Sequence, residues 1–348
     1  MNRYLATFAP GFEEIIGSLL LQSIPSASDI QISSGILFFS RSGPPDEVVS
    51  AAFFNNIFLI LQEWKTNTCP FPEMVKTAAK SSRLPSVAPT LTGLAEGTFR
   101  VRYSRENQFC SVDKNVMENA ERYITASTGL LPDRLNPGIE FWYIIRREGY
   151  SFFAVRLTKK QSTEKYLAQG ELRPEIVQLI VGLARVSDLD RTLLDPFAGY
   201  GSIPERLALT QKDAVVYASD IDPARESDMK TRFSGNSAVS VRRADALYLS
   251  HIESASIDLI VTDPPWGFWD GDVYAGANSI SSLYTKMLEE FYRVLSGRGR
   301  AIVLTGAKKE FEEAVSQSKG FVHCTQAKGY RTDILVNGKK SAIFCLMR

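Results

Sequence analysis

The chain has 348 residues, 44% of them hydrophobic and 23% charged, which is typical of a globular protein large enough for two or three domains. No apolar run approaches the ~20 residues of a membrane span, and the short run IIGSLLL follows Glu13 and Glu14 instead of the basic region of a signal peptide. The four cysteines are scattered without a C-x-x-C pair, which argues against a metal site or a disulfide framework and favours a cytoplasmic protein.

The net charge of +1 is unevenly distributed along the chain. Residues 1–64 carry 2 Lys/Arg and 6 Asp/Glu, a net charge of −4, and residues 174–348 carry 21 and 22, a net charge of −1. Residues 65–173 carry 17 and 11, a net charge of +6. This composition alone is compatible with a solvated basic surface or with a surface that binds a polyanion such as nucleic acid.

Residues 1 to about 62 predict a small α+β unit. The strand-like YLATF precedes the helical FEEIIGSLLLQSI, a second strand GILFFS, and a helix over DEVVSAAFFNNIFLILQEW. The next segment mixes basic helices with strands. The helices are expected over VKTAAKSSRL and DKNVMENAERYITAS, and the strands over FRVRYS, IEFWYIIRREG and YSFFAVRLT, the last two joined by a hairpin at Glu148-Gly149.

From about residue 171 short apolar strands alternate with helical stretches. The strands are TLLDP, AVVYASD, SVRRAD, IDLIVTDPP and RAIVLT, and a helix is expected to begin near Pro174 after the polar connector STEKYLAQGELRP. This alternation predicts an α/β domain with a parallel, doubly wound sheet. Its ligand site is expected beyond the carboxyl ends of the strands.

The first of these strands leads into a glycine turn. It ends at Asp195, and Gly199 and Gly201 follow before a helix that begins around Ile203. Glycines let the backbone approach a ligand closely, and the helix N-terminus offers unpaired N–H groups. Because Pro204 stands where the dinucleotide fingerprint has its third glycine, NAD is the poorer interpretation.

The next two strand ends add carboxylates suited to a nucleoside. Asp220 could accept from both ribose hydroxyls, or be a solvated loop acid, and Asp222 is expected to cap a helix that starts at Pro223. Asp245 is well placed to accept from an adenine amine. A close turn, a ribose acid and an adenine acceptor without a phosphate cradle predict S-adenosylmethionine as the cofactor.

The fourth strand ends in Asp263-Pro264-Pro265-Trp266. The prolines stiffen the turn and remove two N–H donors, so the carbonyls and the Asp263 carboxylate remain as acceptors for the exocyclic amine of a base. Trp266 offers a face on which the base can stack, a contact of ~1–3 kcal/mol. A rigid turn beside a core tryptophan is the alternative interpretation.

Read in order, DPFAGYGS, SDID and TDPPWG resemble the class I methyltransferases that modify amino groups. GELRPEIVQLIVGLARV and DILVNGKKSAIFCLM, together with APGFEEIIGSLL and GILFFS near the N-terminus, resemble the THUMP-domain guanine-N2 methyltransferases that act on tRNA. The resemblance implies a ferredoxin-like domain over residues 1–62, a THUMP domain over 63–158, a linker over 159–170 and a Rossmann-like methyltransferase domain over 171–348.

The resemblance also implies a reaction and a set of roles. The cofactor would be bound by Asp195, Gly199, Gly201, Asp220 and Asp245. The catalytic residues would be Asp263, Pro264, Pro265 and Trp266, transferring methyl to guanine N2 in or near the tRNA acceptor stem, at position 6 or 10. A monomer without metal is expected, and the need for a small helper subunit is left open.

Two departures from the family pattern bear on this interpretation. In the family, the glycine turn often reads Cys-Gly-Ser-Gly-Thr; here Tyr200 is a bulky residue in this turn and could weaken the affinity for the cofactor. The tetrad Asp263-Pro264-Pro265-Trp266 does not determine which guanosine is the target. The alternatives are an RNA-binding protein with an inactive methyltransferase domain and an amino methyltransferase acting on rRNA or on adenine in DNA.

Overall fold

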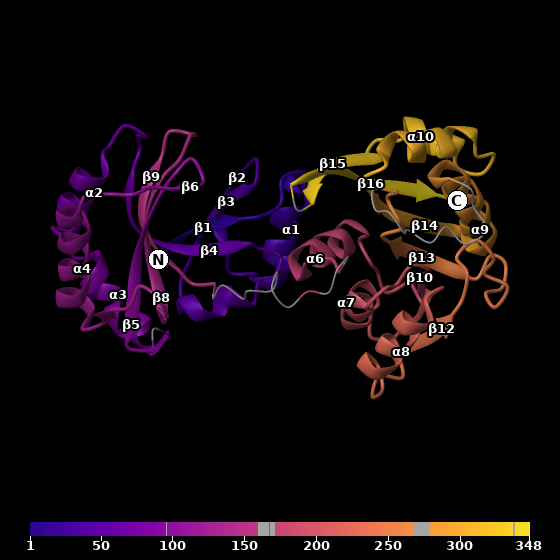
Figure 1. The fold of residues 1–348 in the computed structure, drawn as a ribbon, viewed down its shortest axis with the longest axis horizontal. Helices are drawn as coiled ribbons and strands as arrows, with labels where there is room; N and C mark the ends of the chain where they lie inside the picture. Colours follow the sequence, from indigo (N-terminus) through magenta and orange to yellow (C-terminus); the bar gives the residue numbers. More distant parts are fainter. Residues whose placement is uncertain (95, 159–166, 168–170, 268–278, 337) are drawn as a thin grey trace. The chain divides into compact units, whose positions relative to one another are not determined.

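The structure is a computed structural model that describes residues 1–94, 96–158, 167, 171–267, 279–336 and 338–348. The fold is α/β, as expected, and the chain divides into two compact units, Met1–Phe8 with Gly17–Gln161 and Ala9–Ile16 with Ser162–Arg348. Each unit contains its own β-sheet (Figure 1). Within the described ranges, no helix is long and apolar enough to cross a bilayer.

The N-terminal part of the chain is rich in strands. Its strands are β1 (Asn2–Thr7), β2 (Ser28–Ser33), β3 (Ile36–Arg41), β4 (Asn56–Trp64), β5 (Thr98–Arg105), β6 (Gln108–Phe109), β7 (Leu131–Pro132), β8 (Ile139–Ile145) and β9 (Ser151–Arg156). Its helices are α1 (Glu13–Ser23), the 3₁₀ helix η1 (Pro45–Ser50), α2 (Phe71–Ala78), α3 (Arg83–Leu94) and α4 (Lys114–Thr128).

These strands form one sheet in the order β2-β3-β1-β4-β9-β8-β5-β6, with β7 beside β5. The sheet curls, because the Phe38 ring of β3 lies 5.6 Å from the Phe152 ring of β9 although β1 and β4 separate the two strands. On the opposite face, the stacked rings of Tyr103, Tyr143 and Phe153 contact Phe71 of α2 and Tyr123 of α4. Figure 1 shows α2, α3 and α4 beside this sheet.

The expected hairpin at Glu148-Gly149 is confirmed by the antiparallel pairing of β8 with β9. The helix expected over DEVVSAAFFNNIFLILQEW is wrong, because this stretch contains part of η1 and then β4. Strand β4 lies between β1 and β9 and is buried on both faces over most of its length, so its apolar run does not alternate and resembles a buried helix. VKTAAKSSRL, expected as one helix, contains the break between α2 and α3.

The expected boundary between residues 62 and 63 stays a prediction. Strands from both sides of it belong to one sheet, since β4 pairs with β9. The expected linker over 159–170 lies outside the described residues except for Leu167.

The second unit alternates strands and helices as the sequence predicts. Its strands are β10 (Thr192–Asp195), β11 (Val215–Asp220), β12 (Val239–Arg243), β13 (Ile257–Thr262), β14 (Leu295–Thr305), β15 (Arg331–Val336) and β16 (Lys339–Met347). Its helices are α6 (Pro174–Leu183), α7 (Ser202–Thr210), α8 (Pro223–Arg232), α9 (Ile280–Val294), α10 (Lys308–Gln317) and the 3₁₀ helix η2 (Val322–Gln326).

The sheet order is β12-β11-β10-β13-β14-β16-β15. Strands β10 to β14 pair in parallel, which confirms the doubly wound sheet, and β16 runs antiparallel between β14 and β15. Helices α9 and α10 cover one face of this sheet, and α6, α7 and α8 lie on the other (Figure 1). The carboxyl ends of β10, β11, β12 and β13 therefore meet at one edge.

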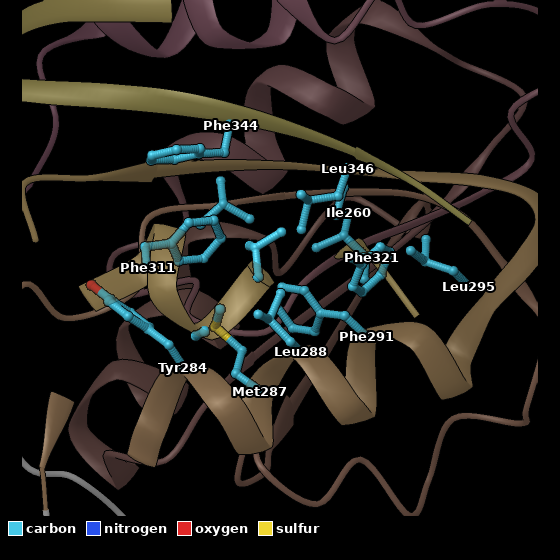
Figure 2. Close-up of a cluster of buried hydrophobic side chains, with 14 of the residues drawn as sticks. Ile260, Tyr284, Met287, Leu288, Phe291, Leu295, Phe311, Phe321, Phe344 and Leu346 are labelled. Carbon is cyan, nitrogen blue, oxygen red and sulfur yellow. The ribbon is translucent and has the colours of Figure 1, made fainter. Parts of the chain in front are cut away.

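The core beneath α9 and α10 fixes this face of the sheet. Helix α9 buries an apolar stripe with helical spacing against β13, β14 and β16. Figure 2 shows the stripe and its neighbours, which include Tyr284, Met287, Leu288, Phe291, Phe311, Phe321 and Phe344.

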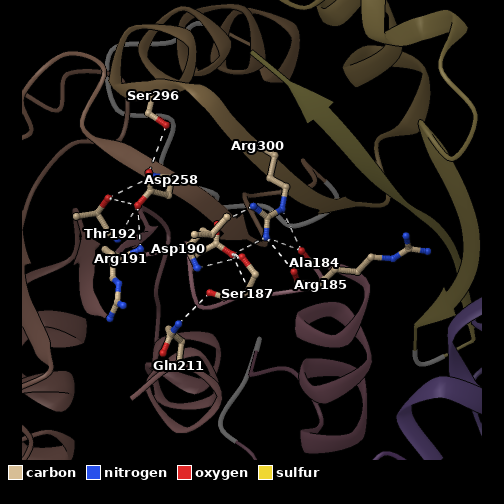
Figure 3. Close-up of polar contacts among 11 residues, drawn as sticks. Ala184, Arg185, Ser187, Asp190, Arg191, Thr192, Gln211, Asp258, Ser296 and Arg300 are labelled. Atoms are coloured by element: carbon tan, nitrogen blue, oxygen red, sulfur yellow. Dashed lines mark hydrogen bonds and ion pairs between the residues drawn. The ribbon is translucent and has the colours of Figure 1, made fainter. Parts of the chain in front are cut away.

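Polar contacts hold the opposite, amino-terminal end of the sheet (Figure 3). Arg300 of β14 donates to the buried Asp190 carboxylate at 2.8 Å and to the Ala184 carbonyl after α6. Asp258 of β13 accepts from the backbone N–H and the hydroxyl of Thr192 at the start of β10. Hydrogen bonds therefore connect the amino-terminal parts of β10, β13 and β14.

Replacing Phe291 by Ala should lower the free energy of unfolding of the second unit by about 3–5 kcal/mol, because it leaves a cavity at a fully buried position. The matched control Glu289→Ala lies on the exposed side of the same helix and should cost less than about 0.5 kcal/mol. Urea unfolding followed by circular dichroism measures both. Equal losses in the two variants would contradict the assigned core.

Candidate functional site

Three carboxylates converge at the carboxyl edge of the parallel sheet. Asp195 is the last residue of β10, Asp220 is the last residue of β11, and Asp263 follows β13 directly. Asp263 and Asp220 both act electrostatically on Asp195 and raise its pKa, so the three groups share one neighbourhood. The structure therefore brings together acids that are up to 68 positions apart in the sequence.

The glycine turn after β10 has the shape that its residues predict. Gly199 and Gly201 have φ values of +51° and +88°, in the left-handed region that favours glycine. A Cβ at Gly201 would stand 2.8 Å from the Phe233 ring, whereas no described atom lies within 4 Å of the corresponding position at Gly199. Gly201 is needed for close packing, and Gly199 leaves room beside the backbone.

Asp220 is bound to this turn. One carboxylate oxygen accepts from the Gly199 N–H at 3.0 Å, and the other accepts from the Asp222 N–H at 2.9 Å. Burial raises the pKa of Asp220 above its ordinary value. Asp222 caps α8 by accepting from the Ala224 N–H, which confirms its expected role. Each Asp220 oxygen retains acceptor capacity for a hydroxyl group.

Asp245 follows β12 and lies near Asp220. The N–H of Ala244 donates to the Asp220 carbonyl at 3.1 Å, and Asp245 accepts from the Leu247 N–H at 2.9 Å. Asp245 is half-buried. The structure thus places the expected ribose and adenine acceptors on adjacent strand ends.

Asp195 lies deeper than the other two acids. It is 1% exposed, and its carboxylate accepts from the Thr262 hydroxyl at 2.7 Å. Burial, reinforced by the charges of Asp263 and Asp220, raises its pKa to about 8. Thr262, which sequence reasoning missed, links the ends of β10 and β13. Asp195 is thus held below the surface of the site, and its predicted contact with a cofactor stays a prediction.

Asp263-Pro264-Pro265-Trp266, hereafter the acceptor turn, follows β13 directly. The Trp266 indole N–H donates to the Asp263 carboxylate at 2.8 Å, which fixes the ring relative to the acid. Burial raises the pKa of Asp263 to about 7, although this hydrogen bond acts in the opposite direction. Burial thus favours the protonated form of Asp263, as it does for Asp195. The second tryptophan of the motif, Trp269, lies outside the described residues.

Sequence reasoning also missed the groups that hold the Pro265 carbonyl. Tyr284 of α9 donates its hydroxyl to this carbonyl at 2.8 Å and lies 2.7 Å from the Thr305 hydroxyl at the end of β14. The sequence did contain a signal for this contact. Tyr284 is the one polar member of an otherwise apolar stripe on α9, and a buried phenol needs a hydrogen-bond partner.

Tyr200, the bulky departure in the glycine turn, is held toward α8. The Arg225 guanidinium lies 3.9 Å from the centroid of the Tyr200 ring, and Arg232 donates to the Tyr200 carbonyl at 3.0 Å. A cation–π contact at this distance fixes the ring position. Any effect of Tyr200 on cofactor affinity therefore also depends on Arg225.

Known proteins resemble this chain at the level of the family and of the fold. The model of the RMKL-like methyltransferase domain matches residues 162–336, just over half of the chain. A tRNA (guanine(10)-N2)-dimethyltransferase from Methanocaldococcus jannaschii is 32% identical over 111 residues, 30% of this chain and 31% of that protein. A release factor glutamine methyltransferase from Bacteroides thetaiotaomicron is 28% identical over 167 residues, 46% of this chain and 60% of that protein.

The chain thus spans less than two thirds of the length of either curated relative. Several solved structures match over nearly the whole chain. TrmN from Thermus thermophilus covers 100% of both chains with a TM-score of 0.78 at 23% identity. SMU.472, a methyltransferase solved with S-adenosylhomocysteine, covers 99% of this chain and 98% of its own with a TM-score of 0.69 at 13% identity. At these identities, the likeness shows a shared fold.

Replacing Asp195 by Asn should make stability less dependent on pH. The folded state retains a proton on Asp195 up to about pH 8, whereas the unfolded state loses it near 3.8, so the contribution of this group to stability falls as the pH rises between these values. Asn is neutral and can still accept from Thr262. Relative to wild type, Asp195→Asn should gain roughly 3–4 kcal/mol in free energy of unfolding between pH 5 and pH 8, because about 1.4 kcal/mol per pH unit accumulates over nearly three units.

Urea unfolding at both pH values measures this gain. Asp213→Asn, at an exposed position, serves as the matched control and should follow wild type at both pH values. A wild-type-minus-variant difference that is the same at pH 5 and pH 8 would show that Asp195 does not hold the extra proton.

Proposed function

The chain belongs to the RMKL-like methyltransferase domain family, and we propose that it transfers a methyl group from S-adenosylmethionine to N2 of a guanosine in tRNA. The target would lie in or near the acceptor stem, and the product would be N2-methylguanosine. The observation that carries the proposal is the Asp263-Pro264-Pro265-Trp266 turn at the same sheet edge as Asp220, the last residue of β11, and the glycine turn whose Gly199 binds it.

The cofactor-side residues fit an adenosyl group. The open space at Gly199 and the remaining acceptor capacity of Asp220 suit a ribose, and Asp245 lies on the next strand end for the adenine. When bound, S-adenosylmethionine would supply an electrophilic methyl group, whose bond to the sulfonium sulfur breaks as the acceptor nitrogen attacks, with the neutral thioether S-adenosylhomocysteine as the leaving group. The protein contributes position and polarity at the opposite side of that methyl group.

The acceptor side has to prepare a weak nucleophile. The lone pair of a guanine amine is delocalised into the ring, and acceptors for its hydrogens favour the pyramidal form that attacks. Asp263 and the Pro264 carbonyl provide such acceptors, and Trp266 provides a ring for stacking. With a pKa of about 7, Asp263 can also take the proton that N2 loses when the new N–C bond forms.

The first unit supports RNA as the substrate class. The buried Glu140 is surrounded by Arg100, Arg102 and Arg156, so three guanidinium groups share one carboxylate. The Arg102 guanidinium lies 5.0 Å from the centroid of the Phe109 ring, which is 67% exposed. Cationic groups beside exposed aromatic rings suit phosphates and unstacked bases.

A glutamine side chain of a protein is the second candidate substrate. Its amide nitrogen is also planar and needs the same acceptors, and one relative in the comparisons is a glutamine methyltransferase. The arginine and aromatic residues around Glu140 favour RNA over this alternative. Both candidates predict the same role for Asp263.

Asp263→Ala should reduce methyl transfer by about 100-fold or more, because the nitrogen loses its principal acceptor in a water-poor site. The assay follows labelled methyl from S-adenosylmethionine to unmodified tRNA transcripts. The exposed Asp213→Ala is the control and should retain wild-type rates. Mapping of the label gives the position, and nucleoside analysis tests for N2-methylguanosine.

Each outcome bears on one alternative. Binding of the cofactor and tRNA without transfer would favour an inactive domain or a required helper subunit. Label in rRNA, DNA or a glutamine peptide, with tRNA unlabelled, would retain the chemistry and reject the substrate.

The rate of methyl transfer should also rise with pH through about 7. The ionised Asp263 accepts the amine hydrogens, and the protonated form predominates below its pKa. Trp266→Phe removes a donor that lowers this pKa, so the midpoint should move to higher pH. Profiles of kcat/KM from pH 5.5 to 8.5 measure both effects. A wild-type profile that stays flat across this range would contradict Asp263 as the titrating acceptor.

A further inference from the structure

We infer that Tyr284 is a positioning residue that holds the acceptor turn through the Pro265 carbonyl. Its expected effect on kcat rests on the proposed methyl transfer. Its expected effect on the order of the acceptor turn rests only on the hydrogen bonds of the second unit. Tyr284 does not itself touch the reacting atoms; it acts through the turn.

The acceptor turn has fewer backbone hydrogen-bond donors than an ordinary turn. Pro264 and Pro265 have no N–H, so at these two positions the backbone can form hydrogen bonds only through its carbonyl groups, as an acceptor. Two side chains provide donors to this segment. Trp266 donates to the Asp263 carboxylate at one end of the turn, and Tyr284 donates to the Pro265 carbonyl at the other.

The Tyr284 hydroxyl belongs to a chain of hydrogen bonds with a defined direction. A phenol carries one hydrogen, and here it points to Pro265, so the Thr305 hydroxyl donates to the Tyr284 oxygen. The Thr305 oxygen in turn accepts from the Ala307 N–H at 3.0 Å. The chain runs from the start of α10 to the acceptor turn, and each bond polarises the next.

The fold fixes both side chains of this relay. Strand β14 pairs in parallel with β13, which brings Thr305 to the edge where Pro265 lies. Tyr284 is 0% exposed, and its ring packs edge-on against Phe311 at 5.2 Å. Figure 2 shows its hydroxyl pointing away from the apolar cluster. The Tyr284 ring packs in the hydrophobic core, and its hydroxyl binds the Pro265 carbonyl of the acceptor turn.

Tyr284→Phe removes the hydroxyl and retains the ring. On this inference, kcat falls about 10-fold or more, while KM for S-adenosylmethionine and for tRNA stays within about twofold, because the substrates still bind beside a less ordered acceptor. Phe321→Leu, at a fully buried position of the same core whose ring contacts Tyr292, is the control for a general effect of the core and should retain wild-type kcat. Thr305→Ser, which keeps the hydroxyl, should retain more of kcat than Thr305→Val, which removes it at similar volume.

Hydrogen–deuterium exchange tests the same inference without catalysis. The peptide covering residues 258–267 should exchange faster in Tyr284→Phe than in wild type, whereas that peptide should stay protected in Phe321→Leu. Unchanged exchange in Tyr284→Phe would overturn the inference, and so would an equal loss of kcat in Phe321→Leu. Faster exchange in a protein that methylates no tRNA would reject the proposed substrate and keep the role of Tyr284.

Discussion

Parallel pairing of β10, β13 and β14 gives the second unit two chemically different edges. At the amino edge, Asp190 accepts a hydrogen bond from Arg300. Burial acts to raise the pKa of Asp190, but hydrogen bonds from Arg300 and Ser187 outweigh it and hold the pKa below its ordinary value. At the carboxyl edge no described guanidinium pairs with Asp195 or Asp263, and burial raises both pKa values. At one edge an acid is paired with a guanidinium group, and at the other burial favours the protonated form of the acids.

The carboxyl edge carries a cost in stability that the rest of the unit must offset. Two neighbouring acids that resist ionisation weaken the folded state as the pH rises. The dense core between α9 and the sheet provides the opposing term, since each large buried side chain contributes roughly 1.5–3 kcal/mol. The same helix also carries Tyr284 to the Pro265 carbonyl, so stability and geometry of the acceptor turn depend on one packing interface.

The sequence predicts the second unit well because the features that identify its elements each depend on a few neighbouring residues. Gly201 needs a positive φ, Asp222 caps the helix that Pro223 begins, and acids stand at the strand ends. The first unit is harder, because β4 is buried on both faces and loses the alternation that identifies a strand. The links from Thr262 to Asp195 and from Tyr284 to Pro265 join residues 67 and 19 positions apart, which no local pattern encodes.

The acceptor turn alone does not choose a substrate. A carboxylate, two stiff carbonyls and an indole suit any planar amine, whether in guanine, adenine or a glutamine amide. On the proposed function, the choice falls to residues 65–173, which carry a net charge of +6, while the residues that follow carry −1. The attraction to a polyanion therefore resides outside the methyl-transfer chemistry, and added salt should weaken RNA binding more than it alters the bound-state rate of transfer.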